Sequence, residues 1–271
     1  MKIRVRAPAT TANLGPGFDC AAVALELWNE LEVCDDGPAP DPEHLAVRAF
    51  ARLAPLDGLS FSFTDRIPRA RGLGSSAATI ALGLVAGTLV AGRDDGADAL
   101  LALGLDLEGH ADNLAAALAG GVCLTCDGAI ARIADGAPAV PIALVPEHEV
   151  GTAAARAALP ESVPYADAAF SVARATLLGA ALAARSAPLF AAAAEDRLHE
   201  PYRARHAPLL AAVRADPPAG AVGATLSGSG PSVIVWAAAD AAEDCAHELE
   251  RRFPDVDVLR LAVSPAGAGP L

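Results

Sequence analysis

A short glycine- and serine-rich segment followed directly by an apolar stretch is the feature that most constrains how this chain can fold. The segment reads Pro68-Arg-Ala-Arg-Gly-Leu-Gly-Ser-Ser-Ala-Ala78, and the apolar stretch continues to Gly92. Glycines let the backbone curl closely around a ligand, and a helix N-terminus adds unpaired N–H groups and positive potential. The pattern therefore predicts a turn that opens a buried helix. The turn is either an anion site or a plain turn with a serine cap.

Lysine is almost absent from the chain. Lys2 is the only lysine among 20 basic residues, which face 33 acidic residues, so the formal net charge is −13. This excludes a P-loop that ends in Gly-Lys-Ser/Thr and the strand lysine of protein kinases, and it argues against Schiff-base catalysis on a buried lysine. The acidic surplus repels phosphate backbones, so we expect no nucleic-acid partner. A phosphate site in this chain would have to rely on backbone amides and Mg²⁺.

The cysteines and the apolar segments indicate a reduced, cytoplasmic protein. The five cysteines are an odd and scattered set, which is typical of chains without disulfides. Cys123 and Cys126 have the spacing of a zinc half-site but lack a second pair, so we expect both in the core of a strand. The apolar run at 77–92 is shorter than the ~20 residues that span a bilayer, and the N-terminus lacks the apolar segment of a signal peptide. We therefore expect no membrane partner.

The order of the predicted elements favours an α+β fold. Residues 3–7 and 23–33 alternate as strands, with a loop predicted over 8–19 between them. Further along, strands and helices mix without a strict β-α alternation, which argues against a doubly wound parallel sheet. The turn residues Asp135-Gly-Ala-Pro138 predict a boundary. The two predicted domains are residues 1–136 and 137–271.

The glycine-rich segment also fits a second kind of motif. Gly72-x-Gly74-x-x-Ala77 matches the dinucleotide fingerprint, with Asp94 and Asp95 about 20 residues further on. That fingerprint follows directly on an apolar strand, and the residues Pro68-Arg-Ala-Arg71 do not end one. A dinucleotide-dependent dehydrogenase is therefore the runner-up class.

Three more segments could carry chemistry. Glu108-Gly-His-Ala-Asp-Asn113 suits a metal- and hydroxyl-binding corner, or else a capped helix with a packed histidine. Thr225-Leu-Ser-Gly-Ser-Gly-Pro-Ser232 is either a second backbone cradle or a hairpin-like turn. Thr152 and Arg156 are four residues apart, so they share one helical face. Arg156 and Arg203 offer two guanidinium groups that can bind a carboxylate. The alternative is that both are ordinary surface arginines.

Taken together and in this order, the segments resemble the GHMP small-molecule kinases. Ala7-Pro-Ala-Thr-Thr-Ala-Asn-Leu-Gly-Pro-Gly-Phe-Asp19 resembles the first motif of that family, and 68–78 resembles its nucleotide loop. Glu108–Asn113 resembles its "EGHPDN" corner, and Gly223–Val233 its third glycine-rich motif. Thr152-x-x-x-Arg156 and Pro201-Tyr-Arg203 match as well. The resemblance covers residues 3 to about 236. It makes the dinucleotide-dependent dehydrogenase a much weaker interpretation than the kinase.

The resemblance implies a fold and a reaction. The fold is the α+β, two-domain GHMP kinase fold, with an N-terminal ribosomal-protein-S5-like domain that binds ATP and a C-terminal ferredoxin-like α/β-plait domain. The similarity is greatest to members that transfer the γ-phosphate of ATP to the side-chain hydroxyl of L-homoserine in threonine biosynthesis. Another amino acid or a hydroxy acid is the alternative substrate. Mg²⁺ is the implied metal, and the family allows a homodimer.

The resemblance also implies roles for individual residues. Backbone amides of 70–76 would hold the phosphates, and Ser76 with Glu108 would hold Mg²⁺. The implied nucleotide-binding residues are Pro68, Arg69, Ala70, Arg71, Gly72, Leu73, Gly74, Ser75, Ser76, Ala77 and Ala78. The implied acceptor-site residues are Asn13, Asp19, Asn113, Arg156 and Arg203 for binding, with Asn113, Asp112 and Thr152 near the reacting hydroxyl.

These roles are chemically consistent with an amino-acid acceptor. A zwitterion needs an acid for its ammonium group, here Asp19, and cations for its carboxylate, here Arg156 and Arg203. Asn113 would orient the hydroxyl, but an amide cannot take a proton. We therefore favour catalysis by positioning and charge neutralisation, with the proton passing late to the phosphate. Asp112 or Asp19 as a general base is the alternative.

Two departures from the family pattern concern the nucleotide base and one helix. The segment from Asp35 to His44 is shorter than usual, and His44 stands where the family often has asparagine near the adenine. Ser171 replaces a residue that is commonly asparagine. The contacts to the base are therefore the part of the site that the motifs specify least.

Overall fold

The chain forms ten strands and ten α-helices, and the computed structural model describes all 271 residues. The strands are β1 (Lys2–Asn13), β2 (Gly17–Cys34), β3 (Ser60–Thr64), β4 (Val122–Cys126), β5 (Ala129–Ala134), β6 (Val140–Pro146), β7 (Ala221–Leu226), β8 (Val233–Ala237), β9 (Val256–Arg260) and β10 (Gly269–Pro270). The helices are α1 (Leu45–Phe50), α2 (Ser75–Val90), α3 (Ala97–Glu108), α4 (Ala111–Ala119), α5 (Thr152–Ala157), α6 (Tyr165–Ala184), α7 (Ala187–Ala193), α8 (Glu200–Arg203), α9 (Pro208–Ala215) and α10 (Ala242–Arg252). A single 3₁₀ turn, Ala204–His206, follows α8.

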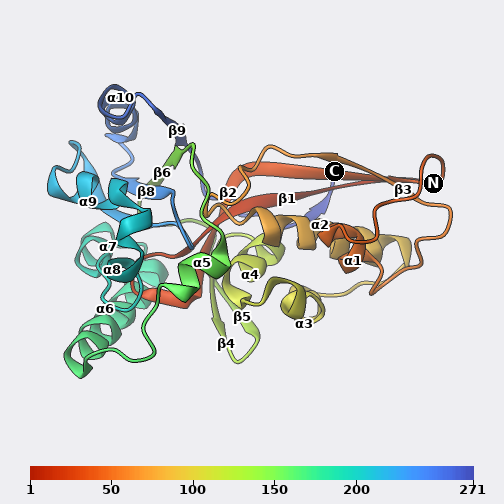
Figure 1. Cartoon of the computed structure of the whole chain (residues 1–271), viewed down its shortest axis with the longest axis horizontal. Helices are drawn as coiled ribbons and strands as arrows, with labels where there is room; N and C mark the ends of the chain where they lie inside the picture. Colours follow the sequence, from red (N-terminus) through yellow and green to blue (C-terminus); the bar gives the residue numbers. More distant parts are fainter.

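The strands make two antiparallel sheets, one in each half of the molecule (Figure 1). The first has the order β10-β1-β2-β4-β5, with β3 paired to the far end of β2. The second has the order β7-β8-β6-β9. Its chain order of strand, helices, two strands, helix and strand is that of a ferredoxin-like plait. The predicted α+β class is confirmed, and the antiparallel first sheet excludes the parallel sheet that a dinucleotide-dependent dehydrogenase would need.

The predicted loop over 8–19 is wrong for most of its length. Residues 8–12 continue β1 and pair with β2, and the small side chains of 9–12 pack at 0% exposure beneath α2 and α4. The turn is confined to a short segment in which Asn13, Leu14, Gly15 and Asp19 all have positive φ. These left-handed residues bend the chain sharply and direct the polar side chains of Asn13 and Asp19 toward one end of the sheet.

A continuous core joins the two halves. Phe190 and Trp236 of the second half belong to the same buried cluster as Val5 and Leu82 of the first. A smaller cluster fills the space between the second sheet and the helices α9 and α10. The last residues return to the first sheet, where β10 pairs with β1. The division into residues 1–136 and 137–271 stays a prediction, with this returning strand as its exception.

Helix α6 is the one helix long and apolar enough, by length and composition, to cross a membrane. Its most apolar window has a mean hydropathy of 1.3, and 22% of that window is buried. Alanine rather than large apolar residues makes up this hydropathy, and the helix lies along α7 with Asp167 paired to Arg197. We therefore describe it as a surface helix of the second half.

The two cysteines of the CxxC sequence lie in different environments. Cys123 is 1% exposed, and burial raises the pKa of its thiol to about 11. Cys126, at the end of β4, is exposed. The prediction of a core position is therefore confirmed for Cys123 and wrong for Cys126, because positions three apart on a strand face opposite sides.

Candidate active site

Three segments that the sequence singled out meet at the start of α2. The hydroxyl of Ser227 donates to the carbonyl of Gly72 at 2.7 Å, and the amide of Gly228 donates to Ala12. The amide Nδ2 of Asn13 donates to the carbonyl of Gly228 at 2.9 Å. The glycine-rich loop, the β1–β2 turn and the loop between β7 and β8 therefore form one wall, although they lie far apart in the sequence.

Glycines in the loop before α2 are required by close backbone contacts. Gly72 and Gly74 have φ of 76° and 67°. A Cβ on Gly72 would overlap the carbonyl oxygen of Ser227, and one on Gly74 would overlap the hydroxyl of Thr10. Gly74 caps α2 without a side-chain hydrogen bond, so the first N–H groups of the helix have no capping side chain. The loop thus presents backbone donors at the positive end of a helix.

Three cavities follow one another across this wall. The outer cavity, of about 320 Å³, is lined by residues of α1 and the start of α2. The middle one, of about 110 Å³, shares Ala70, Ser75 and Ser76 with it. The inner one, of about 40 Å³, shares Glu108 and Asn113 with the middle one. Together they form a path that leads from α1 past the loop into the interior.

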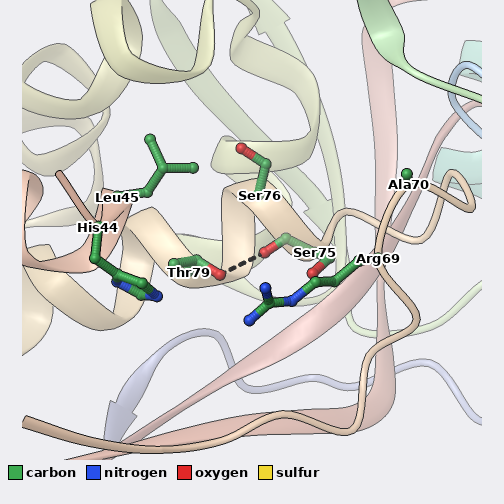
Figure 2. A pocket seen from close by; sticks show the side chains of 7 residues that line it. All are labelled: His44, Leu45, Arg69, Ala70, Ser75, Ser76 and Thr79. Atoms are coloured by element: carbon green, nitrogen blue, oxygen red, sulfur yellow. Dashed lines mark hydrogen bonds between the residues drawn. The ribbon is translucent and has the colours of Figure 1, made fainter. Parts of the chain in front are cut away.

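The outer cavity has an aromatic and a cationic side. Figure 2 shows His44 and Arg69 on either side of Thr79, with Ser75 and Ser76 along the same stretch of α2. Nδ1 of His44 accepts a hydrogen bond from the amide of Ala46, and the ring centres of His44 and Phe63 lie 4.2 Å apart. Burial, with a smaller effect of Arg69, lowers the pKa of His44. A neutral ring therefore faces this cavity at neutral pH.

Ser76 and Glu108 meet between the middle and inner cavities. The hydroxyl of Ser76 donates to Glu108 Oε2 at 2.7 Å. Burial raises the pKa of Glu108 to about 7, and the hydrogen bond from Ser76 opposes the shift. No cation stands beside this carboxylate to lower its pKa further. A hydroxyl and a carboxylate are hard oxygen ligands that fit Mg²⁺, which takes its remaining ligands from water and phosphate. No cluster of three or more His, Cys, Asp or Glu side chains gathers elsewhere.

Asn113 is held in one orientation by its neighbours. Its Oδ1 accepts from the hydroxyl of Thr10 at 2.7 Å, while Asp112 Oδ1 accepts from the Asn113 backbone amide at 2.7 Å and from Nδ2 at 3.4 Å. A flipped amide would place an oxygen against the Asp112 carboxylate, so the orientation shown is the favourable one. Asp112 is 3% exposed, and burial raises its pKa to about 6.

Opposite charges close the inner cavity. Arg156 donates to Asp19 Oδ1 at 2.5 Å, and the Nε of Arg156 is buried without a partner. Arg203 is 2% exposed and lines the same cavity. The guanidinium carbons of Arg156 and Arg203 lie 5.5 and 5.3 Å from the ring centre of Phe18. Asp19 and two arginines thus stand together at one side of a space of the size of a small polar group, which Glu108 and Asp112 also line.

The structure brings most of the predicted site residues to this path. The predicted residues that line its middle and inner cavities are Asn13, Asp19, Pro68, Ala70, Arg71, Gly72, Gly74, Ser75, Ser76, Glu108, Asp112, Asn113, Thr152, Arg156 and Arg203, and Arg69 lines the outer one. Leu73, Ala77 and Ala78 are 0% exposed, so their side chains belong to the core. Arg71 uses its guanidinium on Glu149 and on the carbonyls of Arg69, Pro146 and Glu147. The ligand role of each residue stays a prediction.

Sequence reasoning overlooked several residues of the site. Gly228 and Ser229 line both the middle and the inner cavity; their segment fits a second backbone cradle, but neither residue received a role of its own. Phe18 lies inside the first motif but carried no assignment. His199 stands four residues before Arg203, a spacing that places two side chains on one helical face.

Comparison with known proteins agrees with this geometry. Residues 44–121 match the model of the N-terminal domain of the GHMP kinases, and residues 178–255 match the model of their C-terminal domain. A homoserine kinase of Synechococcus sp. is 39% identical over 269 residues, covering 90% of this chain and 88% of the relative. One of Streptomyces avermitilis is 41% identical over 265 residues, covering 87% and 85%.

A solved structure gives the same result for the fold. The crystal structure of homoserine kinase from Cytophaga hutchinsonii matches with a TM-score of 0.87 and 26% identity, covering 100% of this chain and 97% of that one. Both family models match in the expected order, and the curated relatives cover most of the chain. The chain therefore belongs to the GHMP kinase family.

Proposed function

We propose that this protein phosphorylates L-homoserine. The γ-phosphoryl group of ATP is transferred to the side-chain hydroxyl, and the products are ADP and O-phospho-L-homoserine, a step of threonine biosynthesis. The curated relatives named homoserine kinase, at 39% and 41% identity over most of the chain, support this substrate. Use of ATP follows from membership of the GHMP kinases.

The single observation that carries the substrate is the charge arrangement of the inner cavity. Asp19 can receive an ammonium group, and Arg156 and Arg203 can receive a carboxylate. In the ligand-free arrangement Asp19 and Arg156 bind each other. An amino-acid zwitterion replaces this ion pair by two new ones, whereas a neutral sugar would leave Arg203 without a counter-charge from the ligand. The cavity therefore suits an amino acid that carries a hydroxyl.

The phosphates of ATP fit the backbone-lined middle cavity. All residues of 70–76 except Leu73 line this space, and the first turn of α2 begins beside it, so that its uncapped N–H groups can bind an anion. Ser76 and Glu108 would hold Mg²⁺, which supplies charge neutralisation for the triphosphate. The base would then lie in the outer cavity beside the neutral ring of His44. This order leaves the γ-phosphate facing Asn113, where the middle and inner cavities meet.

Asn113 orients the acceptor hydroxyl. Because Thr10 occupies its Oδ1, the Nδ2 group of Asn113 is the one left to donate to the oxygen of the acceptor. Asp112 has its Oδ1 engaged by the backbone amide of Asn113. We therefore assign catalysis to positioning and charge neutralisation, with the hydroxyl proton passing late to the transferred phosphate. Thr152, at the start of α5, stands beside this point.

An ADP-release assay tests the proposal. The purified protein is incubated with MgATP and, in turn, L-homoserine, L-threonine, mevalonate and shikimate. We expect turnover with L-homoserine to exceed that with each other acceptor, because only an amino acid matches the charges of the inner cavity. If another acceptor is preferred, the substrate assignment is wrong while the kinase assignment stands. Omission of Mg²⁺ should abolish turnover.

A cytoplasmic location and a homodimeric state complete the proposal. All five cysteines are free thiols in the structure, which suits a reducing compartment. Fractionation of the cells that express the protein would test the location. Light scattering would give the mass of the particle in solution.

A further inference from the structure

A buried histidine outside the predicted site contacts one of the two arginines of the inner cavity. His199 is 0% exposed, and its Nε2 lies 2.8 Å from the carbonyl oxygen of Gly15. Its Nδ1 lies 3.2 Å from Nη1 of Arg203. The ring also stacks on Phe18, with the ring centres 5.0 Å apart. His199 thus links the β1–β2 turn to the arginine.

The two partners of His199 determine its protonation state. A carbonyl oxygen can only accept, so Nε2 must carry a proton, and a guanidinium can only donate, so Nδ1 must be bare. The ring is therefore the neutral tautomer with hydrogen on Nε2. Burial lowers the pKa of His199, with Arg203 acting in the same direction and Asp196 opposing it. The arginine and the ring cannot both be charged at this contact.

The contact leaves Arg203 with one free face. Its Nη1 is occupied by His199 and by the carbonyl of Gly228 at 3.2 Å, and its Nε points to the carbonyl of Ala155 at 3.5 Å. Its Nη2 has no partner in the protein, and the residue lines the inner cavity. Nη2 is therefore the nitrogen that can donate to a ligand. Rotation of the guanidinium away from this orientation would break the contact with His199.

The backbone around His199 is held in place by the carboxylate of Asp196. Asp196 accepts hydrogen bonds from the backbone amides of Leu198, His199 and Glu200, and Ser171 donates to the same carboxylate at 3.1 Å. Ser171, which replaces the usual asparagine of the family, thus takes part in this hydrogen-bond network. The network holds the turn that precedes α8, so that the ring cannot follow Arg203 if the arginine moves.

We propose that His199 is a positioning residue for acceptor recognition, which holds the guanidinium of Arg203 so that Nη2 meets the carboxylate of the substrate. The proposal rests on the proposed function, because it concerns the carboxylate of an amino-acid acceptor. His199 acts through Arg203 and touches neither the nucleotide nor the reacting hydroxyl. Its removal should therefore weaken acceptor binding selectively.

A matched pair of variants tests the proposal. Asparagine at 199 places an acceptor oxygen where Nδ1 stands, whereas glutamine reaches the position of Nε2 and keeps only the donor to Gly15. We expect His199→Gln to raise the KM for L-homoserine by roughly tenfold, the effect of one charge-assisted hydrogen bond, and His199→Asn to raise it several times less. The KM for ATP should move by less than twofold in both variants. A merely structural link to Gly15 predicts the reverse order, which would overturn the proposal.

Two further measurements separate the role from general damage. In an Arg203→Gln background, His199→Gln should add no further increase in KM, because the histidine acts through that arginine. With 3-aminopropan-1-ol, which lacks the carboxylate, wild type and His199→Gln should have equal kcat/KM. An additive effect in the double variant, or an equal loss with the analogue, would refute the assignment. Failure of the wild-type protein to use L-homoserine would instead refute the proposed function.

Discussion

The two ends of the proposed site, one for the nucleotide and one for the acceptor, differ in which part of the chain lines them. The nucleotide end depends mainly on close main-chain packing, with Gly72 and Gly74 packed against Ser227 and Thr10 and the first turn of α2 beside the cavity. The acceptor end consists of long charged side chains, with Arg156 and Asp19 paired and Arg203 beside them. Binding at the nucleotide end therefore depends on how closely backbone segments approach one another, and binding at the acceptor end depends on charge.

This difference explains how a chain with a single lysine can handle a triphosphate. Backbone amides and a helix N-terminus attract anions without any basic side chain. The proposed function therefore leaves Arg156 and Arg203 of the inner cavity for the acceptor. The comparison also predicts that steric changes damage the nucleotide end, whereas changes of charge damage the acceptor end.

The largest effect should follow from Gly74→Ala. The added Cβ would overlap the buried hydroxyl of Thr10, which in turn holds Asn113. We expect kcat/KM to fall by roughly 100-fold or more, the equivalent of about 3 kcal/mol, with a raised KM for ATP. Steady-state kinetics with both substrates would measure this.

Gly92→Ala is the matched control for this steric effect. Gly92 follows α2 and has a φ of 63°, close to the 67° of Gly74, but a Cβ there would meet no atom within 4 Å. It carries the same backbone strain without the overlap, so its activity should stay near that of the wild type. Equal losses in the two variants would show that backbone strain, rather than the close contact, accounts for the effect.

Arg156→Ala should produce the next largest effect, on the acceptor alone. The loss of a charge-assisted pair costs about 1.5–3 kcal/mol, so the KM for L-homoserine should rise by roughly 10- to 150-fold, while that for ATP stays within about threefold. Arg66→Ala, which removes an exposed partner of Glu30, is the control and should change neither. A similar rise in both KM values for Arg156→Ala would contradict the division of the site.

Asp112→Asn should have a smaller effect on turnover. If positioning and charge neutralisation dominate, the amide keeps the contact with the backbone of Asn113 and kcat falls by less than about tenfold. Single-turnover kinetics at saturating substrates would isolate the chemical step. Near-complete loss of kcat with unchanged KM values would instead identify Asp112 as the general base.

An effect on stability rather than on turnover concerns pH and the pair Ser76 and Glu108, the proposed metal ligands. Burial raises the pKa of Glu108 to about 7 from an ordinary value of 4.5, so the folded state keeps a proton that the unfolded chain has released. Stability without ligands should therefore fall as pH rises from about 4.5 to about 7, and this residue should contribute on the order of 1–2 kcal/mol.

Urea unfolding at pH 5 and pH 8 would measure that contribution. Glu200 and Asp112 also have raised pKa values, so the wild-type curve contains more than one group. The difference between wild type and Glu108→Gln isolates the one residue, and the variant should lose less stability on going to pH 8. Parallel curves for the two proteins would contradict the expectation.

The motifs named segments that the structure brings together around the same cavities, because loops that bind phosphate require glycine at particular positions and zwitterion recognition requires charges of both signs. The sequence also indicated the α+β class and the buried helix after Pro68–Ala78. It misplaced the strand ends around residues 8–19, because the small alanines and threonines there resemble a loop. Only their pairing with β2 and their burial under α2 and α4 make them a strand.

What the sequence determined by itself was the set of chemical groups: a glycine-rich turn that can bind phosphate without lysine, a corner that suits a hydroxyl or a metal, and an acid with two arginines. What only the tertiary structure decided was which of these groups remain available to a ligand. The guanidinium of Arg71 donates to backbone carbonyls and to Glu149, and Oδ1 of Asn113 accepts from Thr10. His199 binds Nη1 of Arg203 and leaves Nη2 without a partner. Such pairings join residues distant in the chain, so local pattern cannot reveal them. They depend on how the two sheets bring the three loops together.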